Sequence, residues 1–207
     1  GGLANNLSAL VDQIQLFARL NGTSISAESS NNWGLNGRGY YIATRLMWNP
    51  NADVNAMLAD FYEKAFGPAA SIMKKYYDYV DGGKKYKVDE SFLREIFLLI
   101  GQAANAAKER PDVMARLNHL KQHLRFVELR YDYNREKNKD KRKELFLQVM
   151  THVFRTRYNY MEHWNAMYNT WKVQAIKEFN EPSWMYHGYE KVPKPWEVAA
   201  PVSAEEI

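Results

Sequence analysis

The stretch TSISAESSNNWGLNGRGYYIATRLMWNP, residues 23–50, changes its character halfway along. Its first five residues, 23–27, begin with a β-favouring threonine and place their apolar side chains on one side of an extended chain, which predicts a short strand. Its last part, from about residue 38 to 48, has apolar residues at helical spacing and stops before Pro50, because the residue before a proline resists helical geometry. A loop rich in Ser, Asn and Gly, residues 29–37, joins them. We therefore predict a strand, a loop and a helix in this order.

An amphipathic helix precedes this stretch. Apolar residues recur at helical spacing from Leu7 to Ala18, and Asn21-Gly22 ends the helix, with Gly22 expected as its left-handed cap. A helix, a tight turn and a strand form half of an α/β unit. A single strand needs a partner, and no other segment has a clear strand pattern. We therefore expect the partners of this strand to lie outside the chain.

Everything after Pro50 has the periodicity of helices. The helix limits are marked by four cap and turn signals: Asp53, Gly67-Pro68, Asp89 and Pro111. The last periodic region, residues 141–179, is long enough for one helix or for two with a bend near residues 156–159. From Pro182 onward, prolines and small residues predict an irregular tail.

These patterns predict a mainly α protein, with an α/β segment followed by an antiparallel helical bundle. We expect three segments. Residues 1–50 would be an α/β unit, residues 51–181 a C-terminal helical domain, and residues 182–207 the irregular tail.

The composition excludes several classes of protein and site. The 207 residues include no cysteine, so disulfides and thiolate metal sites are excluded. The formal net charge is +4, with Lys and Arg scattered among Asp and Glu, and we therefore predict no nucleic-acid partner. We also predict no membrane partner, because no apolar run reaches the ~20 residues that cross a bilayer.

Glu28, Asn32 and Trp33 are the candidate substrate-binding residues. Glu28 would lie at the C-terminal end of the predicted strand, where (β/α)8 barrels carry their functional groups. Trp33 could stack on a sugar ring, and Asn31 and Asn32 could hydrogen-bond to its hydroxyls. The alternative is a helix-capping loop with an exposed acid, since acids and amides are common in loops. Glycoside hydrolysis usually takes two carboxyl groups, and no second one lies nearby, so we assign no catalytic residue.

Two histidines and an aromatic stripe are the remaining candidates. His119 and His123 stand four residues apart on one helix face, but no third ligand is evident, and the zincin pattern would place Glu where Leu120 follows. We therefore favour packing or surface roles and predict no metal and no cofactor. The aromatic stripe fits a core or an interface better than a ligand site: Tyr160, Trp164, Tyr168 and Trp171.

The stretch ATRLMWNPNADVNAMLADFYEKAFGPAA, residues 43–70, carries a family resemblance. A Leu-x-Trp-Asn-Pro turn at residues 46–50, an Asp-Val-Asn cap at 53–55 and a Phe-Gly-Pro-Ala-Ala turn at 66–70 follow one another. In this order they resemble motifs of bacterial glycoside-hydrolase-like barrel proteins, which are related in layout to α-glucuronidases and hexosaminidases. The resemblance covers about residues 7–80, and only the helical character matches after that.

The resemblance implies that residues 1–50 are the last strand and flanking helices of a catalytic barrel, with the helical domain packed against it. The first segment would thus be the last α/β unit of a truncated barrel, a remnant of a (β/α)8 barrel. Its implied partners are a carbohydrate, the rest of the barrel and a second copy in a possible homodimer, and it favours a periplasmic or secreted location. Glu28, Asn32 and Trp33 carry over as sugar contacts. The catalytic acid would lie upstream, so we expect the isolated chain to hydrolyse nothing.

Two alternatives stay open. One is a non-enzymatic helical interaction module, and the other is a metal-binding helical protein that uses His119 and His123. The conformation of residues 23–27 bears on the first alternative. A helix or free loop there, in a compact, complete domain, would exclude the barrel fragment and leave the interaction module. An unpaired strand, or pairing with a second copy, would favour the barrel fragment.

Overall fold

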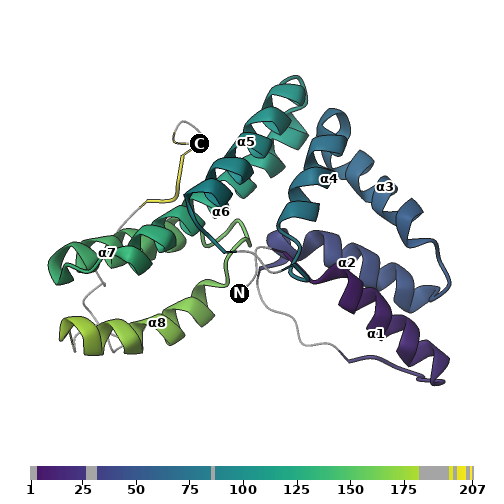
Figure 1. Cartoon of the computed structure of the whole chain (residues 1–207), viewed down its shortest axis with the longest axis horizontal. Coiled ribbons are helices and arrows are strands. Elements are labelled where there is room, and N and C mark those ends of the chain that lie inside the picture. Colours follow the sequence, from purple (N-terminus) through teal and green to yellow (C-terminus); the bar gives the residue numbers. More distant parts are fainter. Residues whose placement is uncertain are drawn as a thin grey trace. The chain divides into compact units, whose positions relative to one another are not determined.

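The computed structural model describes residues 4–26, 32–84, 87–181, 196–197, 200–203 and 206, with the side chains of 172–174 excepted. Within these ranges the regular elements are all helical, eight α-helices and one short 3-10 helix (Figure 1). This confirms the mainly α prediction.

The chain divides into two compact units, Gly1–Leu120 and Lys121–Ile207. The elements are α1 (Leu7–Arg19), α2 (Trp33–Trp48), α3 (Val54–Phe66), η1 (Gly67–Ala69), α4 (Ala70–Tyr79), α5 (Glu90–Ala106), α6 (Pro111–Arg135), α7 (Lys139–Arg155) and α8 (Trp164–Phe179). Helix α6 belongs to the first unit up to Leu120 and to the second unit from Lys121 onward.

The helix limits follow the cap and turn residues of the sequence. An Asp53 carboxylate oxygen accepts two backbone N–H groups of the first turn of α3, at 2.8 and 3.2 Å. Asp89 accepts the Phe92 N–H of α5 at 3.0 Å. Gly67 has a φ of +45°, a conformation that favours glycine, and separates α3 from α4. Pro111 is the first residue of α6, as predicted.

Helices α1 and α2 run in the same direction. Near their beginnings, the Arg38 guanidinium donates to the Asn5 carbonyl at 3.3 Å. Near their ends, the Gln15 side-chain amide donates to the Pro50 carbonyl at 3.2 Å. Antiparallel neighbours need only a short loop, whereas parallel neighbours need a connection that returns along their whole length. We therefore call the chain between α1 and α2 the return segment (Figure 1).

The strand predicted over residues 23–27 is not seen. Residues 23–26 are exposed and form neither a helix nor a strand, while Ala27 and Glu28 lie outside the described residues. A strand needs a neighbour to take up its backbone hydrogen bonds, and no described residue supplies one. The barrel remnant is thus not visible in the described part of the chain.

The turn after α1 also differs from its prediction. Asn21, not Gly22, has the left-handed conformation, with a φ of 57°. Gly22 instead lies against the Phe17 ring, and a Cβ atom there would lie 2.0 Å from that ring, so the ring would have to move. Packing, rather than backbone conformation, favours glycine at this position.

The core around α1, α2 and α3 joins residues on both sides of residue 50. Its buried members are Ile14, Ile42, Ala43, Leu46 and Met57. The domain limits proposed at residues 50 and 181 stay a prediction, since packing alone does not show which segments fold independently.

Two further helix pairs of the described chain, α4–α5 and α7–α8, are antiparallel. In the first unit, the ring of Tyr79 at the end of α4 stacks on Phe92 at the start of α5, 5.2 Å between centroids. In the second unit, Phe154 near the end of α7 contacts Trp164 at the start of α8, and Phe146 contacts Phe179. The region 141–179 is therefore two helices, separated at residues 156–163.

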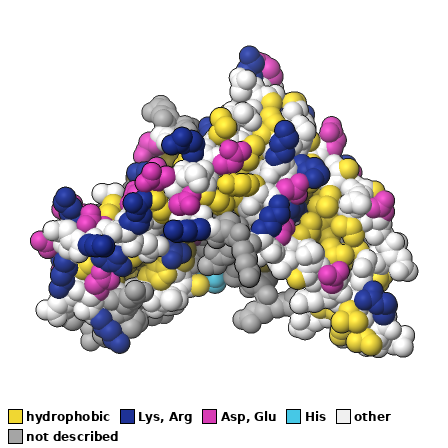
Figure 2. Space-filling view, in the orientation of Figure 1, with side chains coloured by type: hydrophobic (Ala, Val, Ile, Leu, Met, Phe, Trp, Pro, Cys, Tyr) yellow, Lys and Arg dark blue, Asp and Glu magenta, His cyan; other side chains and the backbone are white. Residues whose placement is uncertain are grey.

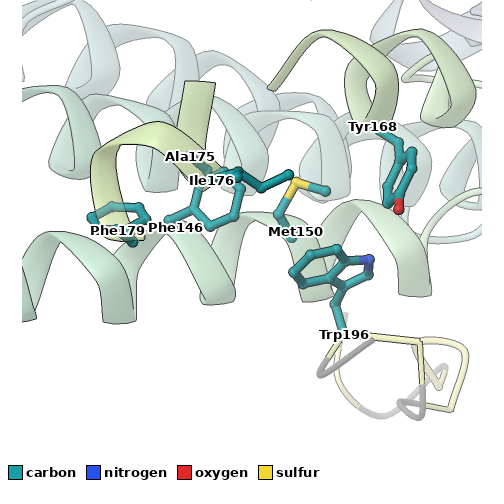
Figure 3. Close-up of a cluster of buried hydrophobic side chains, with 7 residues drawn as sticks. All are labelled: Phe146, Met150, Tyr168, Ala175, Ile176, Phe179 and Trp196. Atoms are coloured by element: carbon teal, nitrogen blue, oxygen red, sulfur yellow. The ribbon is translucent and has the colours of Figure 1, made fainter. Parts of the chain in front are cut away.

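The core of the second unit contains most of the predicted aromatic stripe. Its buried residues are Phe146, Met150, Tyr168, Ala175, Ile176, Phe179 and Trp196 (Figure 3). Trp164 and Trp171 are partly buried and pack against this core, whereas Tyr160 is exposed. Trp196 lies in the segment predicted as an irregular tail, yet its side chain is fully buried.

Candidate functional site

Trp33 is the first residue of α2 and not part of a loop. The predicted loop over residues 29–37 ends at Asn32, which occupies the N-cap position. The side-chain amide of Asn36 donates to the Asn32 carbonyl at 3.2 Å, within the first turn. The helix begins earlier than predicted because Leu35 is buried and anchors this turn, although the composition around it is typical of a loop.

Trp33 forms an aromatic pair with Tyr40. The two positions are two helical turns apart on one side of α2, and their ring centroids lie 4.4 Å apart with the planes tilted by 30°. The Trp33 side chain remains 52% exposed. The pair therefore presents an aromatic surface to solvent while one ring rests against the other.

The structure places two of the three predicted substrate-binding residues. Asn32 and Trp33 are neighbours at the N-terminal end of α2. Glu28 and Asn31 lie outside the described residues, so no side-chain position is assigned to them. The structure therefore brings Asn32 and Trp33 together, and the substrate-binding role of all three residues stays a prediction.

A buried arginine lies on another side of α2. Arg38 is 1% exposed, and its Nη2 lies 2.6 Å from the Asp81 carboxylate. Its other Nη donates to the Tyr77 carbonyl at 3.5 Å. Burial opposes the charge, but hydrogen bonds with Tyr62 and Asp81 outweigh this effect, and the pKa of Arg38 is raised. The guanidinium is therefore held in its charged form.

The Arg38 cluster connects three segments of the first unit. The Asn5 carbonyl before α1 accepts both from Arg38 of α2 and from the Gly82 N–H after α4, the latter at 3.1 Å. A Cβ atom at Gly82 would lie 2.6 Å from the Ala4 carbonyl oxygen. The sequence prediction missed this cluster, although an arginine on the apolar side of a helix is a signal that a buried partner exists.

His123 is occupied by a hydrogen-bond partner. Its Nδ1 lies 2.8 Å from a Glu162 carboxylate oxygen, and both side chains are buried, whereas His119 is exposed. No cluster of three or more metal-ligating His, Cys, Asp or Glu side chains occurs in the part of the chain that the structure describes. This geometry lends no support to the metal-binding alternative.

His152 is a second buried histidine of this unit. Its Nε2 lies 2.8 Å from the Gln122 carbonyl oxygen, to which it donates. Burial lowers the pKa of His152, and this effect outweighs the Gln122 carbonyl, which raises it. His152 therefore contributes a neutral imidazole that links α7 to α6.

Large apolar side chains are exposed at the C-terminal ends of α1 and α2. They are Leu16, Phe17, Leu20, Met47 and Trp48, the last with 92% of its surface exposed. Because the two helices run parallel, these residues lie at the same end of the pair. Figure 2 shows hydrophobic side chains on the surface in this region. We call these five residues the apolar end.

Comparison with known proteins identifies one family over part of the chain. Residues 3–78 match the family model described as a domain of unknown function, DUF4838. This match covers α1 to α4 and agrees in extent with the resemblance over residues 7–80. No curated protein and no solved structure matches the chain. Among the described residues, none of the helices is both long and apolar enough to cross a membrane.

Proposed function

We propose that this chain is the C-terminal portion of a carbohydrate-active, glycoside-hydrolase-like protein. Residues 1–50 contribute the last α/β unit of its barrel, and Glu28, Asn32 and Trp33 contact the sugar. The observation that carries this proposal is the parallel α1–α2 pair with its return segment, together with the exposed Trp33 at the start of α2.

Parallel consecutive helices are typical of α/β proteins. There, both helices cover one side of a sheet, and the chain between them forms a strand of that sheet. The backbone groups of residues 23–26 make no hydrogen bond within the described part of the chain, and these residues are exposed. Residues 23–26 thus have backbone groups that remain available for pairing with a further strand.

The direction of the return segment also supports the position of the sugar site. It runs from the end of α1 toward the N-terminal end of α2. In (β/α)8 barrels, functional groups lie at the C-terminal ends of the strands, next to the beginnings of the helices that follow. Asn32 and Trp33 stand at this place.

The proposal is tested by NMR titration of the chain with cellopentaose, xylopentaose and maltopentaose. We expect at least one of these sugars to shift the indole N–H signal of Trp33 and to leave that of Trp48 unchanged. Trp48 is a matched control, since it is an exposed tryptophan at the opposite end of the same helix. Trp33→Ala should abolish binding, and Trp48→Ala should not. If none of the three sugars binds, the proposal is wrong.

The isolated chain should not hydrolyse glycosides, because retaining and inverting mechanisms both use a pair of carboxyl groups and only Glu28 is a candidate here. We expect no release of nitrophenol from a panel of nitrophenyl glycosides. Turnover by the purified chain that persists in Glu28→Gln would show that another carboxyl pair exists within these residues. Turnover lost in Glu28→Gln would place catalysis at Glu28 itself.

The apolar end favours a second candidate function, a helical interaction module that forms a homodimer. A contiguous exposed apolar patch typically marks a protein contact. Sedimentation over a range of concentrations tests this candidate. We expect association that Leu20→Glu and Trp48→Glu each weaken, while Trp33→Ala leaves it unchanged. A chain that stays monomeric at high concentration excludes the homodimer.

A further inference from the structure

Gly37 leaves open space beside the Trp33–Tyr40 pair. Residues 33, 37 and 40 are separated by four and three positions, so they lie on one side of α2. A Cβ atom at Gly37 would have no neighbouring atom within 4 Å, whereas one at Gly39 would lie 2.3 Å from the Asn5 side chain. A side chain at position 39 would therefore have to displace the Asn5 side chain, whereas one at position 37 would meet no neighbouring atom.

A glycine inside a helix destabilises it relative to alanine. The φ of Gly37 is not positive, so the backbone does not require glycine there either. A glycine inside a helix that neither packing nor backbone conformation requires is expected at functional sites, where a ligand approaches the backbone closely. Gly37 lies one helical turn from Trp33 on the same side of α2.

This side of α2 is uncharged. Its residues are Trp33, Asn36, Gly37, Tyr40 and Thr44. Arg38 is buried on another side of the helix, and the Arg45 guanidinium lies over the Tyr41 ring. The segment just before α2, residues 27–31, adds one acid, Glu28, and no cation. A carboxylate or phosphate ligand would find no counter-charge among these residues.

We infer that Trp33, Gly37 and Tyr40 form one subsite that binds a neutral pyranose ring, and this inference rests on the proposed function. The Trp33 indole stacks on the C–H face of the sugar, as aromatic rings do on apolar surfaces. Tyr40 holds the indole in place, and Gly37 leaves room for the edge of the sugar at the helix backbone. The Asn36 side chain, next to Gly37, offers an amide to the hydroxyls.

The chemistry of this subsite narrows the substrate class. Stacking requires a pyranose with a continuous C–H face, as in gluco- or xylo-configured units. The uncharged surface disfavours uronic acids and sugar phosphates relative to neutral sugars, because it offers no cation to pair with their charge. The inference thus adds two positioning residues, Gly37 and Tyr40, and predicts a neutral substrate.

Gly37→Ala is the decisive variant, with Gly101→Ala as its matched control. Gly101 lies inside α5, and a Cβ atom there would also have no neighbouring atom within 4 Å. Both alanines should raise the thermal midpoint, because both remove a helical glycine. Only Gly37→Ala should weaken binding of the neutral pentasaccharide that shifts Trp33, by several-fold. A stabilised variant with weaker binding cannot be explained by a damaged fold.

Tyr40 is tested as a positioning residue by two substitutions. Tyr40→Ala should weaken binding about tenfold, comparable to the loss of one aromatic contact. It should also move the Trp33 indole signal in the free protein, since the neighbouring ring is gone. Tyr40→Phe should restore both the affinity and the signal, because the ring rather than the hydroxyl holds Trp33.

The outcomes separate this inference from the proposed function. If Trp33→Ala abolishes binding while Gly37→Ala and Tyr40→Ala leave it unchanged, the subsite is wrong and the proposed function stands. If pentagalacturonic acid binds more tightly than the neutral pentasaccharides, the neutral substrate class is wrong. If no neutral pentasaccharide binds to the wild-type chain, the proposed function fails together with the inference.

Discussion

Arg38 is a charged residue whose side chain is almost completely buried. Arginine is almost never fully buried unless it is paired, and here Asp81 supplies the opposite charge while backbone carbonyls of Asn5 and Tyr77 accept further hydrogen bonds. Such a pair contributes little net stability compared with apolar residues, but the loss of one partner is costly. The burial of the charged Arg38 side chain therefore depends on its pairing with Asp81.

Asp81→Asn should lower the free energy of unfolding by about 3 kcal/mol, because it leaves the Arg38 charge buried without a counter-charge. The matched control is Asp78→Asn, whose pair with Lys74 is exposed and should cost less than about 0.5 kcal/mol. Denaturant unfolding of the two variants measures both. Equal losses would show that Arg38 does not depend on Asp81.

His152 should make the stability of the chain depend on pH. Its pKa is lowered by burial from the usual 6.5, so the unfolded state binds a proton more readily than the folded state. The neutral His152 contributes fully to the free energy of unfolding above pH 6.5. This contribution is lost as the pH falls through the lowered pKa of His152 in the folded state.

We therefore expect the free energy of unfolding to fall more steeply below pH 6.5 in the wild type than in His152→Gln. Glutamine cannot titrate but can still donate to the Gln122 carbonyl. Urea unfolding at a series of pH values gives the difference between the two proteins, in which the other titrating groups cancel. If the free energies of unfolding of the two proteins fell in parallel with pH, the pKa of His152 would not be lowered in the folded state.

At the scale of elements, the ends of the helices depend on neighbouring residues, and their directions depend on distant ones. Asp53 caps α3 and Gly67 ends it, each through contacts within a few positions. The parallel arrangement of α1 and α2 is instead held by contacts of Arg38 with Asn5 and of Gln15 with Pro50.

Asp53→Ala should lower the free energy of unfolding by about 1 kcal/mol, since two N–H groups at the start of α3 lose their acceptor. Asp53→Ser is the matched control, because serine is also a good N-cap and should retain most of the stability. Thermal unfolding compares the three proteins. A serine variant as unstable as the alanine variant would show that the charge, and not the cap, matters.

At the scale of the whole molecule, each of the two units has its own core. In the second unit, Trp196 lies outside the described helices and completes a core built by α7 and α8. Its ring lies 6.2 Å from that of Phe146 and 6.1 Å from that of Tyr168. Trp196 is therefore part of this unit and not an appendage.

Trp196→Ala should destabilise the second unit by about 3 kcal/mol or more, because it leaves a large cavity in a core. Hydrogen exchange should show reduced protection of the amides of α7 and α8. Trp196→Phe should restore part of the protection, since it refills part of the volume. Unchanged protection in the alanine variant would mean that Trp196 is not required for this core.

The sequence by itself determined the helical class, the caps at Asp53 and Asp89 and the break at Gly67. These features depend on residues a few positions apart, which a pattern in the sequence can reveal. It also singled out Trp33, although it placed this residue in a loop.

Only the tertiary structure decided the features that depend on contacts between residues far apart in the sequence. Arg38 finds Asp81 43 positions away, and Trp33 shares a helix face with Tyr40 because α2 begins before its loop-like sequence suggests. Residues 23–26 have a strand pattern but no strand, since an extended segment becomes a strand only when a neighbour takes up its hydrogen bonds. Long-range contacts compete with local preference, and their outcome cannot be read from spacing alone.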